Sequence, residues 1–375
     1  MSGCYLSGSI PSTPSINFSS LVTLDLSSNW FQGPIPVDLQ NMTSLRHLDL
    51  SDNAFNSSIP NCLYSFSHLE FFNLCGTNLQ GTISSSIGNL TSAISIDLSY
   101  NELGGKVPRS LGSIPTSIGS LIRLSYLHLY NNKFSRKLPS SLKNCKELVS
   151  IDIAENEFVG SIPSWIGHRL SGALLVIKGK VLEYSTTLQL LNIIDLSKNN
   201  LSGQIPKEVT SLQGLQSLNL SFNSLNGRIP KNIGDMGSLE SIDFSVNQLS
   251  GQVPQSMSRL TFLSHLNLSN NHLIGRIPSS TQLQSLTASS FVGNKLCGPP
   301  LANKCTINYV KPNTENERSK DFGGLEVDWF YVSMGLGFGV GFGVVWGPLL
   351  MNKHRRFLYF QFLDRLGNKL RGVVS

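Results

Sequence analysis

The architecture follows from one nine-residue stretch, Leu21-Val-Thr-Leu-Asp-Leu-Ser-Ser-Asn29, which recurs along the 375-residue chain. Close copies of it end at Asn53, Asn223, Asn247 and Asn271. The closing asparagine advances by 24 residues from Asn29 to Asn53, and by 24 again from Asn223 to Asn247 and to Asn271. A fixed interval of this size predicts stacked structural repeats rather than a single globular core.

Each copy has the order L-x-x-L-x-L-x-x-N, followed by a glycine and proline segment such as Leu201-Ser-Gly-Gln-Ile-Pro206. In L-x-L the leucines point to one side of a short strand and the x residues to the other. The pattern resembles the leucine-rich repeat, so we expect an α/β-type solenoid with parallel strands on its concave face. We count about ten repeats, including a half-repeat at Leu6–Pro11. Stacked asparagines should satisfy backbone groups in each turn.

Two intervals depart from 24 residues. The interval from Asn101 to Asn132 is 31 residues, and we favour a repeat that lost 17 residues over one that gained seven. The interval from Asn156 to Asn199 is 43 residues, and its segment 164–190 fits no repeat. Segment 164–190 is either an inserted island or a degenerate repeat. We therefore divide the repeats into blocks 1–163 and 191–278.

The repeat pattern stops after Pro278, and we expect residues 279–310 to cap the solenoid. Cys297 and Cys305 lie close together there, and a local disulfide is favoured if the chain is exported. The other four cysteines are expected to be buried or free: Cys4, Cys62, Cys75 and Cys145. Neither a second cysteine pair nor a histidine cluster completes a zinc site, so no metal is expected.

The C-terminal part of the sequence predicts a membrane anchor. An acidic linker at 311–328 precedes 329–351, in which Phe330 to Met351 is free of charged residues. As a helix this stretch would measure about 33 Å, enough for a single transmembrane span; the alternative is a buried soluble helix. The basic tail 352–375 carries a net charge of +5 of the chain's +6, which predicts a cytoplasmic tail and extracellular repeats. The basic pI therefore reflects the tail, and no nucleic-acid partner is expected.

Small residues and sequons add to this membrane prediction. A glycine at every fourth position of the span suits packing against a partner helix, although glycines are also tolerated in membranes: Gly335, Gly339, Gly343 and Gly347. Seven N-x-S/T triplets, all N-terminal to the span, predict N-glycosylation: Asn17, Asn41, Asn56, Asn89, Asn200, Asn219 and Asn267.

No catalytic motif is found, and recurrent acids such as Asp25 and Asp49 occupy one repeat position, which indicates a structural role. We therefore expect neither an enzyme nor a cofactor. Ligand contacts are expected at the variable strand positions of the concave face. Seven residues there replace the usual small polar ones: Arg46, His47, Glu70, Phe71, Tyr126, His128 and Tyr130.

The combined motifs resemble the plant leucine-rich-repeat receptor-like proteins, nearest to the tomato Cf and apple scab-resistance type. They include the island remnant Lys178–Tyr184, Phe291-Val-Gly-Asn-Lys-Leu-Cys-Gly-Pro-Pro300, the glycine-rich span and the short basic tail. The resemblance implies kinase-less plasma-membrane receptors for extracellular, often microbial, ligands. It also implies an adaptor receptor kinase that packs on the glycine stripe, and a somatic-embryogenesis-type co-receptor kinase on repeats 191–278.

This sequence departs from the family pattern in lacking a signal peptide and an N-terminal cysteine cap, so we expect an N-terminally truncated form. Four functions are weighed. The leading one is a defence receptor, and the second is a developmental peptide receptor of the same architecture. The others are a wall-enzyme inhibitor and a non-functional copy or decoy.

Overall fold

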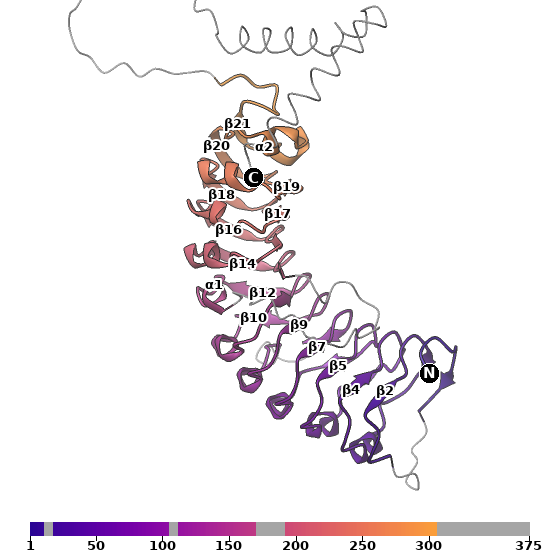
Figure 1. The fold of residues 1–375 in the computed structure, drawn as a ribbon. Helices are drawn as coiled ribbons and strands as arrows, with labels where there is room; N and C mark the ends of the chain where they lie inside the picture. Colours follow the sequence, from indigo (N-terminus) through magenta and orange to yellow (C-terminus); the bar gives the residue numbers. More distant parts are fainter. Residues whose placement is uncertain (11–17, 105–111, 170–191, 306–375) are drawn as a thin grey trace, which may run out of the picture. The chain divides into compact units, whose positions relative to one another are not determined.

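Ten three-residue strands, formed by the x-L-x segments, build one parallel sheet (Figure 1). They are β2 (Thr23–Asp25), β4 (His47–Asp49), β5 (Phe71–Asn73), β7 (Ser95–Asp97), β9 (Tyr126–His128), β11 (Ser150–Asp152), β13 (Ile193–Asp195), β15 (Ser217–Asn219), β17 (Ser241–Asp243) and β19 (His265–Asn267). Every strand pairs in register with that of the next repeat; His47, for example, lies opposite Phe71. The sheet lines the inner side of the curved stack of repeats.

The computed structural model describes residues 1–10, 18–104, 112–169 and 192–305. The described repeats belong to one compact unit, Met1–Ile307. The linker 311–328, the predicted span 329–351, its glycine stripe, the basic tail and Asn17 lie outside the described residues. Within the described residues, no helix is long and apolar enough to cross a bilayer.

The glycine and proline segments form a second set of parallel strands beside the first. They are β1 (Ser7–Gly8), β3 (Trp30–Phe31), β6 (Gln80–Gly81), β8 (Glu102–Leu103), β10 (Ser135–Arg136), β12 (Glu157–Gly160), β14 (Asn200–Gln204), β16 (Ser224–Gly227), β18 (Gln248–Gly251), β20 (His272–Arg276) and β21 (Lys295–Cys297). Seven of them, from β10 to β21, form one sheet, while β1–β3 and β6–β8 are separate pairs.

Short helices follow the prolines and lie along the outer side of the stack (Figure 1). They are η1 (Val37–Asn41), η2 (Asn61–Ser65), η3 (Ser85–Asn89), η4 (Thr116–Ser120), η5 (Ser140–Asn144), α1 (Ile166–Arg169), η7 (Lys207–Ser211), η8 (Ile233–Asp235), η9 (Gln255–Arg259), α2 (Thr281–Ser285) and η10 (Ala288–Phe291). Because a 24-residue repeat leaves room for only one turn there, most of these are 3-10 helices of three to five residues.

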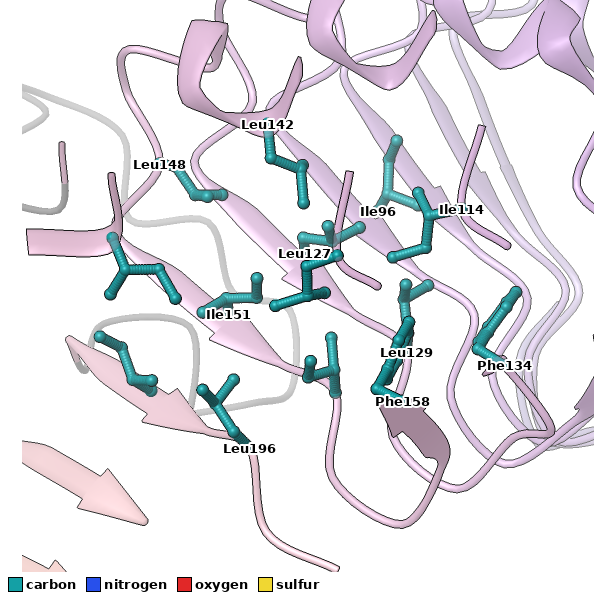
Figure 2. Packing of buried hydrophobic residues seen from close by; sticks show 14 of the residues in the cluster. Ile96, Ile114, Leu127, Leu129, Phe134, Leu142, Leu148, Ile151, Phe158 and Leu196 are labelled. Atoms are coloured by element: carbon teal, nitrogen blue, oxygen red, sulfur yellow. The ribbon is translucent and has the colours of Figure 1, made fainter. Parts of the chain in front are cut away.

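The core is a stack of equivalent side chains, one layer per repeat. Ile96, Leu127 and Ile151, the central residues of β7, β9 and β11, are fully buried and lie side by side (Figure 2). Phe134 and Phe158 stack in successive repeats with ring centroids 6.2 Å apart. Each layer is covered by the next, so one repeat alone could not bury its leucines.

The predicted asparagine ladder is confirmed by its hydrogen bonds. Asn247 donates through Nδ2 to the carbonyls of Leu220, Phe244 and Ser245 at 3.0–3.2 Å. Its Oδ1 accepts from the backbone N–H of Leu225 at 2.9 Å. Thr77 replaces asparagine once, and its hydroxyl donates to the Leu74 carbonyl at 2.6 Å.

The stack of strands continues across both irregular intervals. In the 31-residue interval β7 pairs directly with β9. In the 43-residue interval β11 pairs directly with β13, so Asp152 lies opposite Asp195. No repeat's strand therefore separates β11 from β13, which favours an insertion over a degenerate repeat; the island itself stays a proposal.

Two boundaries differ from the sequence-based ones. The island is predicted to begin at residue 164, but Ile166 of α1 is buried in the core and α1 packs against η7. The repeat therefore extends through α1, and the boundary at 164 is too early. After Pro278 the repeat does not simply stop, because β21 pairs with β20 and Asn294 accepts the Leu273 N–H at 3.0 Å. The capping segment thus continues the ladder, and a disulfide joins Cys297 to Cys305 in it.

Candidate ligand-binding face

Each repeat presents five side chains on the concave face. They belong to the residue before the strand, the strand's first and third residues, and the second and third residues after the strand. The third strand position is acidic or amidic in nine of the ten strands: Asp25, Asp49, Asn73, Asp97, Asp152, Asp195, Asn219, Asp243 and Asn267.

These nine side chains are structural. Each accepts a hydrogen bond from the backbone N–H two residues further on, as Asp97 does from Ser99 at 2.9 Å. The bond closes the turn that leaves the strand, as in an Asx-turn. The structural role expected for the recurrent acids is therefore confirmed.

The repeat of strand β9 is the exception at three of its five concave positions. It presents Tyr126, His128 and Tyr130, where β7 presents Ser95, Asp97 and Ser99 and β11 presents Ser150, Asp152 and Ala154. Both flanking serines at the first position are buried, Ser95 with 5% and Ser150 with 2% exposure. Three large side chains thus lie in one line between two rows of small ones. We call them the β9 ridge.

Further residues contact the β9 ridge at Tyr130. Tyr100 and Tyr130 make an edge-to-face contact with ring centroids 4.9 Å apart. Burial and the neighbouring Glu155 carboxylate, which pairs with Lys198, raise the pKa of the Tyr130 hydroxyl. These contacts hold the Tyr130 ring in place while Tyr100 stays 55% exposed.

The imidazole at the centre of the β9 ridge lies between two carboxylates. His128 Nδ1 is 3.7 Å from Asp97 Oδ2, and Asp152 is its register partner on β11. Burial lowers the pKa of His128, but Asp97, with a smaller contribution from Asp152, outweighs burial and leaves that pKa above 6.5. Burial raises the pKa of Asp97, yet His128 and the Ser99 N–H leave it below 3.8.

This pair makes stability depend on pH. Because the pKa of His128 is raised in the folded state, the protonated ring stabilises the fold, and this contribution is complete below pH 6.5. The contribution is lost as the pH rises through the folded-state pKa of His128. Because the pKa of Asp97 is lowered in the folded state, its carboxylate stabilises the fold above pH 3.8, and this contribution is lost in stronger acid.

We expect His128→Asn, which restores a residue type found at this position, to reduce the loss of stability between pH 6 and pH 8. Denaturant midpoints measure this, and the exposed His68→Asn should leave the pH profile unchanged. Equal profiles for wild type and His128→Asn would refute the assignment.

The other four predicted ligand residues form a separate patch on β4 and β5. Arg46 Nη1 pairs with Glu70 Oε1 at 2.9 Å. The rings of His47 and Phe71 contact each other with centroids 5.6 Å apart. Strand β7 separates this patch from the β9 ridge, so the structure does not bring the seven residues together.

The structure adds Asp97, Tyr100, Glu155 and Lys198, which the sequence-based selection missed. Tyr100 directly precedes the ladder residue Asn101 and has a positive φ of 52°. An exposed tyrosine at a position that favours glycine or asparagine is a signal that the sequence does contain.

The face around β9 is open, not a pocket. One hollow of about 630 Å³ lies between η7 and η8 on the convex side, and one of about 530 Å³ lies between β19 and residues 285–290. The first is a gap between neighbouring helices, away from the β9 ridge. In the part of the chain described, no group of three metal-ligating side chains comes together.

Four of the predicted glycosylation sites are exposed: Asn41, Asn56, Asn89 and Asn200. Asn219 and Asn267 lie on concave strands, where each donates to the neighbouring aspartate, Asp195 or Asp243. Glycosylation at any of these positions stays a prediction. The described cysteines Cys4, Cys62, Cys75 and Cys145 are free.

The fold and this face define a leucine-rich-repeat protein. One leucine-rich-repeat family profile matches residues 213–273, and another matches 20–42, 44–66, 68–90, 123–145 and 190–212. Over 199 residues the chain is 60% identical to Receptor-like protein EIX2 of tomato, Solanum lycopersicum. The matched residues cover 51% of this chain and 19% of EIX2. The repeats and this identity support a plant leucine-rich-repeat receptor-like protein.

Solved receptor ectodomains have the same fold. The TDR receptor is 32% identical with a TM-score of 0.63, covering 74% of this chain and 43% of that chain. The Arabidopsis receptor kinase HAESA, in complex with an IDA peptide hormone ligand, is 32% identical with a TM-score of 0.57, covering 80% of this chain and 53% of that chain. The chain thus spans about a fifth of EIX2 and about half of each of these ectodomains.

Proposed function

We propose that this chain is a cell-surface receptor that recognises an extracellular protein or peptide through the β9 ridge and acts in plant defence. The observation that carries the proposal is the replacement of small polar residues by Tyr126, His128 and Tyr130 at three concave positions of one repeat. A small polar side chain is enough to satisfy the backbone hydrogen bonds of the turn after each strand. The three large side chains of the β9 ridge are therefore not explained by the turn. The three ring side chains are half-buried, and aromatic side chains held on a rigid scaffold are typical of recognition surfaces.

The open shape of the face supports a macromolecular ligand. Small-molecule sites are concave and enclose most of the ligand, whereas the β9 ridge projects from an extended sheet. The HAESA ectodomain, which binds a peptide hormone, has the same architecture. We further propose that recognition involves no catalysis and that the repeats lie outside the plasma membrane.

The partners follow from the family and from the C-terminal sequence. We propose that the segment 329–351 spans the membrane and that its glycine stripe packs on the helix of an adaptor receptor kinase. A co-receptor kinase of the somatic-embryogenesis type would join at repeats 191–278.

The test is a response assay in leaf tissue that expresses this chain. We expect Tyr126→Ala with His128→Ala to abolish the response to microbial culture filtrate without changing the amount of protein at the surface. The matched control is Tyr5→Ala with His272→Ala, two exposed residues outside the concave face, which should respond like wild type. A full response from the first variant at an equal surface level would contradict the proposal, while loss of surface protein would indicate a folding role.

A developmental peptide receptor is the second candidate, favoured by the likeness to the HAESA ectodomain bound to a peptide hormone. The same two variants separate the candidates when plant secreted peptides replace the culture filtrate. A response that depends on the β9 ridge and occurs only with plant peptides would favour the developmental function.

A further inference from the structure

The concave face is acidic, although the chain as a whole carries +6. Within the described strands, the five positions of each repeat hold two cations, Arg46 and Lys198, each already paired with a carboxylate. The same positions hold ten carboxylates: Asp25, Asp49, Asp52, Glu70, Asp97, Asp152, Glu155, Asp195, Glu240 and Asp243. A face lined by one sign of charge attracts partners of the opposite sign.

Aromatic rings stand within this acidic face. Tyr126 lies on β9, between the strands that hold Asp97 and Asp152, and Tyr130 follows β9 by two residues. Tyr100 contacts Tyr130 from the neighbouring repeat. The faces of tyrosine rings attract ammonium and guanidinium groups. Aromatic rings and carboxylates together are thus complementary to lysine and arginine side chains.

Asp152 has the His128 imidazole on one side but a carboxylate on the other. Elsewhere an asparagine amide donates to the neighbouring acid, as Asn219 does to Asp195 at 2.9 Å and Asn73 does to Asp49 at 3.0 Å. Asp152 instead lies opposite the carboxylate of Asp195 across β11 and β13. Burial, together with the charge of Asp195, raises the pKa of Asp152 to about 6. A ligand cation beside the two carboxylates would relieve this repulsion.

We propose that the concave face binds a basic peptide segment of the ligand, with a lysine or arginine beside Asp152 and Asp195 and against the β9 ridge. This inference rests on the proposed receptor function and names the chemical class of the ligand. The unpartnered sheet face suits an extended chain, and its charge selects a cationic one.

The test uses defined probes on the full chain in a neutral detergent. Three fluorescent twelve-residue glycine–serine peptides carry four lysines, four glutamates or no charge, and fluorescence anisotropy gives Kd at low and high salt. We expect the lysine peptide to bind about tenfold more tightly than the neutral peptide. Asp152→Asn with Asp195→Asn should remove about tenfold of this affinity, since asparagine keeps the turn's hydrogen bond but not the charge.

The matched control removes two charges elsewhere. Glu157→Gln and Glu208→Gln, on β12 and η7, should change the affinity by less than about twofold. If the paired aspartate variant does not fold, Asp152→Asn alone is measured instead. Three results would overturn the inference: no preference for the lysine peptide, preference for the glutamate peptide, or equal weakening by the concave and control variants.

The two proposals fail separately. If the Tyr126 and His128 variant loses the leaf response while the peptides show no charge preference, the receptor function stands and the cationic ligand is wrong. If the lysine peptide binds at Asp152 and Asp195 but no leaf response depends on the β9 ridge, the surface chemistry stands and the receptor function is wrong.

Discussion

Asn247→Ala is expected to lower the free energy of unfolding by about 3–5 kcal/mol, the largest effect of any polar substitution that we consider. The substitution removes three bonds to backbone carbonyls and one from the Leu225 N–H, all of them buried. An unsatisfied buried polar group costs about 1–3 kcal/mol, and alanine leaves several at once. Water cannot replace the lost partner without opening the stack, because Asn247 itself is only 8% exposed.

Two variants calibrate this result. Asn247→Thr should be milder, because Thr77 shows that a hydroxyl at this position still donates to one carbonyl. Asn232→Ala, at an exposed helix start without a side-chain capping bond, should change stability by less than about 0.5 kcal/mol. Denaturant unfolding gives the free energies, and hydrogen exchange at the Leu225 amide reports the local loss directly. Unchanged protection of that amide in Asn247→Ala would contradict the ladder.

Most of the fold could be predicted from the sequence because every repeat solves the same local problem. The leucines, the turn asparagine and the strand-ending acid each depend only on position within 24 residues. Asn53, for example, makes the same bonds as Asn247 in a different layer. Repetition therefore allows one local argument to apply to ten strands.

The site was less predictable because one irregular interval precedes β9 and the other follows β11. Asp97 and His128 are 31 residues apart, and Asp152 and Asp195 are 43 residues apart, yet both pairs lie in register. A constant 24-residue step would misalign these partners. The carboxylates around His128, and hence its charge, become visible only when the strand pairing is known.

Selecting ligand residues by residue type alone also included residues that the structure explains without a ligand. Arg46 and Glu70 differ from the usual small residues, but they satisfy each other as an ion pair. An exposed pair of this kind contributes about 0–1 kcal/mol and needs no ligand to explain it. Tyr126 lies between buried serines, and this difference in surroundings separates it from Arg46.

Gly167→Ala is the second large effect, expected to destabilise the protein by about 3 kcal/mol through overpacking. A Cβ on Gly167 would lie 1.8 Å from the carbonyl oxygen of Glu208 and 2.0 Å from its carbonyl carbon. Both are backbone atoms of η7, so no side chain can rotate away and α1 must move off η7. This is the junction at which the repeats before residues 170–191 pack on those after them.

The control for this substitution is Gly237→Ala, because a Cβ there meets no heavy atom within 4 Å. It should change stability by less than about 0.5 kcal/mol. Denaturant unfolding compares the two variants, and hydrogen exchange at the Val209 amide, which bonds to Pro206 in η7, localises the effect. We expect Gly167→Ala to increase exchange at Val209 first, since opening of the junction exposes η7. A Gly167→Ala protein as stable as Gly237→Ala would mean that α1 and η7 are not in contact. The repeats would then be joined at this point by the pairing of β11 with β13 and of β12 with β14, without support from the convex layer.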